Sequence, residues 1–270
     1  MNMQTMIAVL LLAVTFFSPQ HDASPELAGI AHVAFRVADI QKSRDFYRTL
    51  GFEQSFEFTD PGKPPVSYIK INDRQFIELY GRGSDSQPAG LLHLCYEAAD
   101  IESLWSEYVR HGLNPPHSRK ARAGNLLFVL HDPEGQTLEY TQYLPGSLHF
   151  EDRGKHLSDR RVSQHLMRAV IPVQDVVAEH VFYTSKLGFQ DVAVGETVGM
   201  RLPGNSRDEI ELEAATPATN SFIVFTVADL ARTADDLRSR SLTVKTGDDA
   251  VSVTDPDGVV ILFTLERHKP

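Results

Sequence analysis

The chain has 270 residues, of which 42% are hydrophobic and 23% are charged, a composition typical of a globular protein with room for two domains. Its formal net charge is -10 and no run of Lys or Arg is longer than two residues, which excludes the basic surface that nucleic-acid binding requires. The only cysteine, Cys95, excludes an intramolecular disulfide.

The first predicted element is an apolar N-terminal segment. Met6 to Phe17 is hydrophobic apart from one threonine, which is too short to span a bilayer and typical of the apolar region of a signal peptide. We therefore expect residues 1–24 to be a signal peptide, so that the mature protein is exported to the periplasm or the extracellular space without stable membrane insertion. Without cleavage, the segment would be an N-terminal anchor, or a misassigned start of a cytoplasmic protein.

Residues 30–39 read as a buried strand that ends at the start of a helix. In a strand, alternate residues share a face, so His32, Ala34 and Arg36 point one way while the intervening residues are apolar. Asp39 then has the position and side chain of a helix N-cap. The strand thus has one face for a core and one that presents an imidazole beside a guanidinium.

The pattern of this region recurs along the chain. Residues 37–52 resemble residues 173–189, and fainter copies lie at 98–112 and 227–242, each starting with an aspartate suited to an N-cap. Short strands separated by turns follow each helix, so each unit reads as βαβββ and two units make one domain. We expect domains at 27–144 and 162–267, joined by residues 145–161, which are polar, mixed in charge and without periodicity.

Charged and imidazole side chains recur within the strands of the first half. Glu78 lies in the strand 76–80, His93 follows two leucines, and Glu139 follows the turn Asp132-Pro133-Glu134-Gly135. A carboxylate in an apolar strand is costly unless a partner compensates its charge. Taken singly, each has an ordinary explanation, such as an edge glutamate in water. Two histidines and two glutamates together form a donor set suited to Zn, Ni, Co, Mn or Fe(II).

With these motifs the sequence resembles the vicinal oxygen chelate superfamily, which includes glyoxalase I, methylmalonyl-CoA epimerase, fosfomycin- and bleomycin-resistance proteins and extradiol dioxygenases. The resemblance implies an α+β fold of four βαβββ modules in two tandem domains, each a half-open mixed sheet of eight strands. It further implies one divalent transition metal and no organic cofactor. The four metal ligands that the resemblance implies are His32, Glu78, His93 and Glu139. They lie in the motifs on which the resemblance rests, which are His32 with Asp39 and Phe46-Tyr47, Ile77-Glu78-Leu79, His93-Leu94, and the Asp-Pro turn with Glu139.

By this resemblance we expect a metal-dependent enzyme of the glyoxalase lyase or isomerase kind. It would chelate vicinal oxygens of a small substrate and stabilise an enediolate or oxyanion. Glu139 or Glu78 would serve as general base, and Arg36 would hold an anionic substrate group or, equally, form a salt bridge. We expect a monomer or a homodimer.

Two other functions stay open. An extradiol dioxygenase uses only a His, His, Glu triad, and its signature tyrosine before the Asp-Pro turn is Val129 here, which argues against that activity. A resistance-type protein would sequester a ligand between domains without turnover and would not need a transition metal. Export argues against dependence on glutathione, a cytosolic thiol.

The second half lacks most of the metal ligands. When the repeats are aligned on their aspartates, Arg168 stands opposite His32, and only Glu211 retains the residue type of its counterpart, Glu78. Phe222 and Leu262 replace the remaining histidine and glutamate. We therefore expect a second domain without this metal, and a site that closes within the first domain or across a homodimer of first domains.

Overall fold

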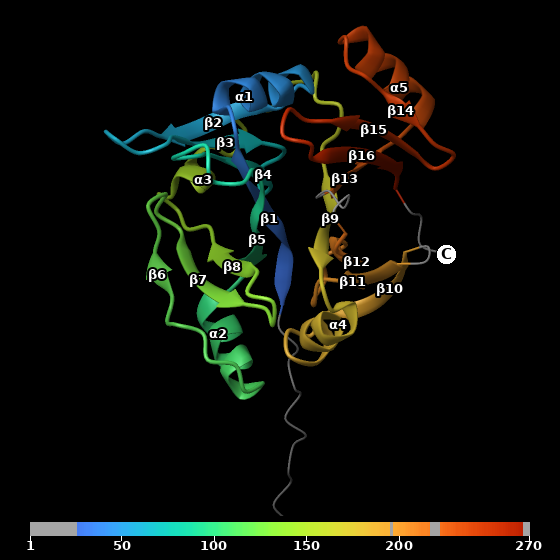
Figure 1. Cartoon of the computed structure of the whole chain (residues 1–270). Coiled ribbons are helices and arrows are strands. Elements are labelled where there is room, and N and C mark those ends of the chain that lie inside the picture. The colour runs from blue at the N-terminus through green and yellow to red at the C-terminus, as the bar shows by residue number, and fades with distance from the viewer. Residues whose placement is uncertain (1–25, 195–196, 217–221, 267–270) are drawn as a thin grey trace, which may run out of the picture.

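The computed structural model describes residues 26–194, 197–216 and 222–266, so the predicted signal peptide at 1–24 lies outside the described residues. Two eight-stranded mixed sheets confirm the predicted α+β fold (Figure 1). The first sheet has the order β2-β3-β4-β1-β5-β8-β7-β6 and contains β1 (Leu27–Val37), β2 (Glu53–Phe58), β3 (Val66–Lys70), β4 (Phe76–Gly81), β5 (Gly90–Ala98), β6 (Arg119–Lys120), β7 (Leu126–His131) and β8 (Thr137–Gln142).

The second sheet repeats this plan with the order β10-β11-β12-β9-β13-β16-β15-β14. Its strands are β9 (Leu166–Val173), β10 (Gln190–Val194), β11 (Thr197–Arg201), β12 (Glu209–Ala214), β13 (Phe222–Val227), β14 (Lys245–Thr246), β15 (Ala250–Thr254) and β16 (Val260–Leu265). The helices are α1 (Ile40–Thr49), α2 (Ile101–Arg110), α3 (Leu148–Glu151), α4 (Val176–Ser185) and α5 (Leu230–Ser239). No helix in the described ranges is long and apolar enough to cross a membrane.

The repeated aspartates act as the expected helix caps. Asp39, Asp100, Asp175 and Asp229 precede α1, α2, α4 and α5. Each of the first three side chains accepts hydrogen bonds from two backbone N–H groups of the first helical turn, and Asp229 accepts one. These N–H groups have no partner inside the helix, so the aspartates define where each helix begins.

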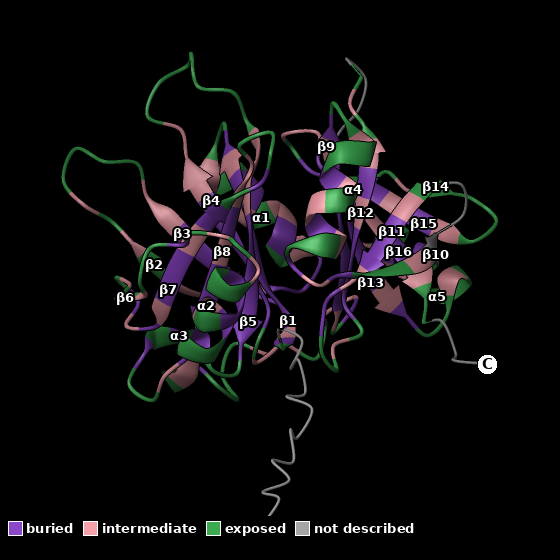
Figure 2. Ribbon diagram, turned by 90° about the horizontal axis from the view of Figure 1, so that it is seen from below, coloured by how far each residue is buried: buried purple, intermediate pink, exposed green. Residues whose placement is uncertain are grey.

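The two sheets share one apolar core. The buried residues Val33 and Phe35 of β1 belong to the same cluster as Phe225 of β13, and the Phe52 ring stacks on Phe225 with centroids 5.3 Å apart. Figure 2 shows buried strands on the facing sides of both halves and exposed residues on helices and loops. Because alternate residues point to opposite faces, the His32 face of β1 points away from this core.

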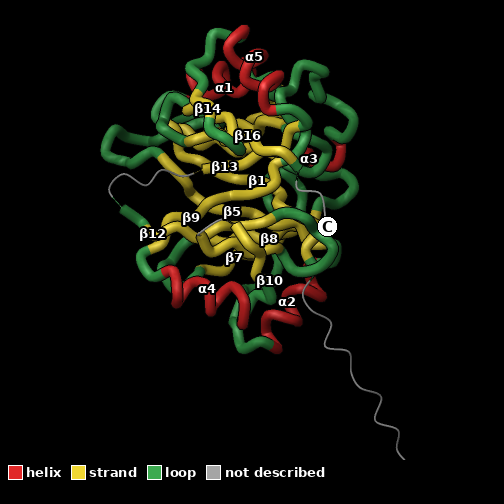
Figure 3. Tube along the Cα trace, turned by 90° about the vertical axis from the view of Figure 1, so that its right-hand side faces the viewer, coloured by secondary structure: helices red, strands yellow, loops and turns green. Residues whose placement is uncertain are grey.

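Two tyrosine–aspartate contacts cross between the halves. Tyr47 on α1 donates to Asp255 (3.3 Å), and Tyr183 on α4 donates to Asp132 (3.4 Å). Figure 3 shows the same crossed arrangement, with α1 and α5 at one end of the molecule and α2 and α4 at the other. Burial, and then the charge of Asp257, raise the pKa of Asp255 to about 6. The repeated tyrosine and Asp-Pro motifs therefore hold the two halves together.

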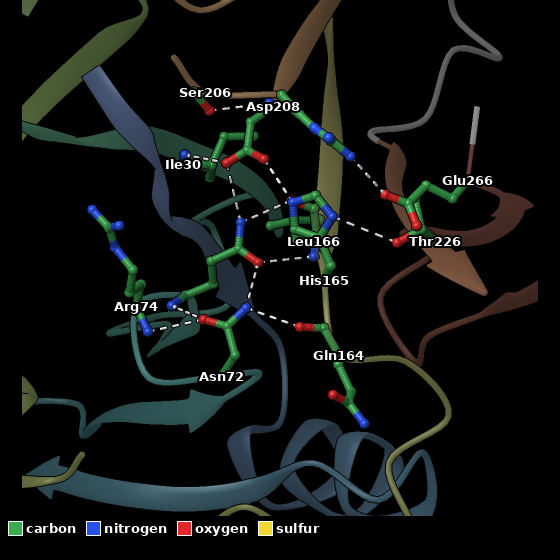
Figure 4. Close-up of polar contacts among 12 residues, drawn as sticks. Ile30, Asn72, Arg74, Gln164, His165, Leu166, Ser206, Asp208, Thr226 and Glu266 are labelled. Atoms are coloured by element: carbon green, nitrogen blue, oxygen red, sulfur yellow. Dashed lines mark hydrogen bonds and ion pairs between the residues drawn. The ribbon is translucent and has the colours of Figure 1, made fainter. Parts of the chain in front are cut away.

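A polar cluster adds a third contact between the halves (Figure 4). Asp208 accepts hydrogen bonds from the Ile30 N–H (2.7 Å) and from Gln75 Nε2 (3.3 Å), both in the first half. His165 Nε2 lies 2.7 Å from the other oxygen of Asp208. Sequence analysis gave His165 no role, because its partner comes from a distant loop.

Residues 145–161, the expected linker, pack against the first sheet. The chain crosses from β8 into α3, which lies between β3 and the β6–β7 turn (Figure 1). The Leu148 N–H donates to the carbonyl of Ala123 (2.8 Å), and fully buried Lys70 forms an ion pair with Asp152 (2.9 Å). This segment therefore covers part of the concave face of the first sheet.

Candidate metal centre

The four expected ligands lie on four adjacent strands of the first sheet. His32 is on β1, Glu78 on β4, His93 on β5 and Glu139 on β8, and the sheet order β4-β1-β5-β8 makes these strands neighbours. Within this order, Ala34 is opposite both Glu78 and His93, while Cys95 is opposite both His32 and Glu139. Across the strands, Glu78, Ala34 and His93 thus form one row on this face, and His32, Cys95 and Glu139 form the next row. Ala34 adds only a methyl group between Glu78 and His93.

The donor atoms of these side chains converge. His32 Nε2 lies 3.0 Å from Glu78 Oε2, 3.0 Å from His93 Nε2 and 3.8 Å from Glu139 Oε1. His93 Nε2 lies 3.4 Å from Glu78 Oε2. Donors bound at about 2.0–2.2 Å lie roughly 2.8–3.1 Å apart at neighbouring octahedral positions and roughly 3.3–3.6 Å apart in a tetrahedral site, so the separations of 3.0 and 3.4 Å suit ligands of one ion. The structure thus brings His32, Glu78 and His93 together within one chain, and Glu139 adjoins this group through His32.

Charge compensation also links these groups. Burial favours a neutral Glu78, but the neighbouring His32 and His93 outweigh it and hold the pKa of Glu78 well below its usual range. Burial likewise disfavours a charged His32, but Glu78 and then Glu139 raise the pKa of His32. The pocket therefore stabilises positive charge beside its carboxylates, which is what a cation site requires.

Two further residues take part in the site. Tyr80 donates to Glu78 Oε1 (3.0 Å) and so orients that carboxylate. Cys95 donates to Glu139 Oε1 (3.4 Å), and burial followed by the Glu139 charge raises the pKa of Cys95 well above its usual value. Sequence reasoning gave neither a role at the site, although Tyr80 and Cys95 each lie two residues from a ligand and so share its face.

The site is open at one end. Arg36 and Tyr80, which lie opposite each other at that end, are half-buried, and Arg36 donates to the carbonyl of Pro88 (3.3 Å). At the other end, Phe76, Cys95 and Tyr143 are buried in a cluster separate from the main core. A ligand can therefore approach the four donors from the side where Arg36 lies.

His149 of α3 closes the opposite end. Its ring stacks on Tyr143 (4.5 Å) and lies edge-on to Phe56 and Phe76 (both 5.0 Å). Neither ring nitrogen has a hydrogen-bond partner among the described residues. Burial, and then the positive charge of His32, lower the pKa of His149 to about 3. The ring is thus a neutral, aromatic part of the wall.

The second sheet places a guanidinium where the first has a histidine. Arg168 donates from Nη1 to Glu211 (2.8 Å) and pairs through Nη2 with Glu209 (3.1 Å). The strand register matches that of the first sheet, with Glu211 opposite Val170 as Glu78 is opposite Ala34. Among the described residues, the groups able to supply three metal ligands lie in the first sheet. In the second sheet, a fixed positive side chain compensates the carboxylate.

Comparison with solved structures shows the fold. The chain is similar to the Mn(II)-bound glyoxalase from Novosphingobium aromaticivorans (17% identity, TM-score 0.70, 90% of this chain and 84% of that one). It is also similar to the 2,3-dioxygenase LapB from Pseudomonas sp. KL28 (15%, 0.68, 92% and 95%) and to a catechol 2,3-dioxygenase (17%, 0.66, 91% and 90%). No curated protein sequence matches the chain.

The family assignment rests on the first half. Residues 29–140 match the model of the Glyoxalase/Bleomycin resistance protein/Dioxygenase superfamily, and this range contains all four converging side chains. The second sheet has the same strand order and the same register around Glu211. Residues 29–140 therefore form a domain of the Glyoxalase/Bleomycin resistance protein/Dioxygenase superfamily, the superfamily to which the sequence motifs pointed.

Proposed function

We propose that this protein is a metal-dependent enzyme of the glyoxalase lyase or isomerase kind, acting on a small substrate with two adjacent oxygen atoms. The observation that supports this most directly is the position of Glu78. Its carboxylate is buried between His32 and His93, at 3.0 and 3.4 Å. In an octahedral shell, four protein donors leave two positions, enough for two substrate oxygens and none for dioxygen. A dioxygenase needs a further open position.

The donor set fits a divalent transition metal. Two imidazoles and two carboxylates suit Mn, Fe(II), Co, Ni and Zn about equally by ligand type, so the identity of the metal is left to measurement. A bound divalent cation would supply Lewis-acid chemistry, since it stabilises negative charge that develops on the substrate oxygens.

The side chains at the site would have different roles in the reaction. Glu78 is held by two histidines and by Tyr80, so it serves as a ligand. Glu139 is 3.8 Å from His32 and more exposed, with 16% of its side chain accessible, so it is the better placed of the two to move a proton. Arg36 at the open end would hold an anionic group of the substrate.

Metal content tests the proposal. The purified chain, stripped and reloaded, should bind about one divalent metal per chain, and His93→Ala and Glu139→Gln should each lower this occupancy. His180→Ala is the matched control, because His180 on α4 pairs with Asp191 on β10 in the second half of the chain, away from the site. Unchanged metal binding in either site variant would contradict the proposed ligands.

Turnover separates the enzyme classes. The loaded protein should catalyse proton exchange or isomerisation of a substrate with adjacent oxygens under anaerobic conditions, and Glu139→Gln should slow it by roughly 100-fold or more. Oxygen uptake with catechols, present in the wild type and dependent on Fe(II), would favour a dioxygenase. Stoichiometric ligand capture without a metal would favour a sequestering protein.

We also propose export of the mature protein, on the sequence of residues 1–24 alone. Mass spectrometry of the N-terminus from the exported fraction tests this. Because all four donors come from one chain, a monomer would suffice for the site.

A further inference from the structure

The metal centre contains a sulfur atom that the four-ligand set does not use. Cys95 is fully buried and lies two residues from His93 on β5, so its side chain points into the same concave face. The strand register places Cys95 directly opposite His32 on one side and Glu139 on the other. Cys95 thus occupies the middle of a row that contains two of the four ligands.

The distances within this row suit a shared ion. Cys95 Sγ lies 3.4 Å from Glu139 Oε1, which is 3.8 Å from His32 Nε2. One donor atom from each of His32, Cys95 and Glu139 can be chosen so that all three lie within 4.8 Å of one another. The compact group His32, Glu78 and His93 meets the same condition, so two donor groups share His32.

The two groups differ in chemical softness. One offers two imidazoles and a carboxylate, which suit Mn(II) or Fe(II), and the other offers a sulfur, which favours thiophilic cations. On the metal centre proposed above, we infer that Cys95 is a further ligand, recruited by thiophilic cations such as Cd²⁺ together with His32 and Glu139 and left uncoordinated by Mn²⁺. Coordination replaces the S–H bond with an S–metal bond and releases the proton to solvent.

The position of Cys95 supports a role at the metal rather than on the surface. Phe76 and Tyr143 are buried in the same cluster as Cys95, while its sulfur lies 3.4 Å from Glu139 Oε1 on the side of the other donors. A Cys95 ligand would therefore change which cations the site retains without creating a separate binding surface.

A charge-transfer titration tests this inference on the whole chain. Because Cys95 is the only cysteine, any thiolate-to-cadmium absorption band in the ultraviolet must come from it. We expect the band to saturate at about one Cd²⁺ per chain. Cys95→Ser should abolish the band and weaken Cd²⁺ binding by at least about tenfold, while Mn²⁺ affinity changes by less than about threefold. Cys95→Ala provides the same comparison if the serine variant folds poorly.

The outcomes separate this inference from the proposed function. Binding of one Cd²⁺ without a charge-transfer band would overturn the role of Cys95 and leave the four-ligand centre intact. Equal losses of Cd²⁺ and Mn²⁺ affinity in both variants would also overturn it, since Cys95 would then only support the shape of the site. Failure of the wild type to bind either cation would overturn the metal centre itself.

Discussion

Removing the Arg168 guanidinium from the second sheet should lower the stability of the fold more than removing a charge from the protein surface. Arg168 is 6% exposed, and its partner Glu209 is 4% exposed. In Arg168→Met, Glu211 loses its 2.8 Å contact and Glu209 its 3.1 Å contact, which leaves two carboxylates without their main cation. Removing one partner of a buried ion pair costs about 3–5 kcal/mol, and we expect a loss of that size.

Urea unfolding at pH 7, followed by circular dichroism, measures this loss. Arg238→Met is the matched control, because Arg238 pairs with Asp235 on the exposed surface of α5 and should change stability by less than about 0.5 kcal/mol. Adding Glu211→Gln to Arg168→Met should restore part of the stability, since one uncompensated charge disappears. A cost below about 1 kcal/mol for Arg168→Met would refute the reading that its charge compensates the carboxylates.

Two further predictions concern pH. Asp255 has a pKa of about 6 in the fold against 3.8 when unperturbed, so the folded chain binds the proton more tightly and stability falls as pH rises from about 4 to 6. Asp255→Asn should therefore stabilise the protein at pH 8 by up to about 3 kcal/mol and have little effect at pH 4, measured by thermal unfolding; no gain at pH 8 would contradict this. His149 has a pKa of about 3 against 6.5, so its contribution to stability is lost as pH falls from about 6.5 towards 3. His149→Phe should raise stability at pH 7 by about 1–3 kcal/mol, because two unpartnered ring nitrogens disappear, and should raise it further at pH 5. Destabilisation at pH 7, measured by urea unfolding, would show that these nitrogens have a partner.

The sequence alone determined the repeat and the fold class, and it identified four candidate ligands. These follow from local rules: an aspartate before each helix satisfies free N–H groups, and alternation along a strand places His32 on the face away from Val33. The spacing of the motifs then identified Glu78, His93 and Glu139 as candidates. The register of the strands confirms the alignment that placed Arg168 opposite His32 in the second half.

Only the tertiary structure decided which partners these residues have. Cys95 contacts Glu139 because two strands pair in one particular register, and Tyr47 reaches Asp255 because the two halves pack in a crossed arrangement. The polar segment around His149 gave no sign of packing, because its contacts with Phe56 and Phe76 come from strands far away in the sequence. Such contacts depend on the three-dimensional packing of distant segments, which local periodicity does not encode.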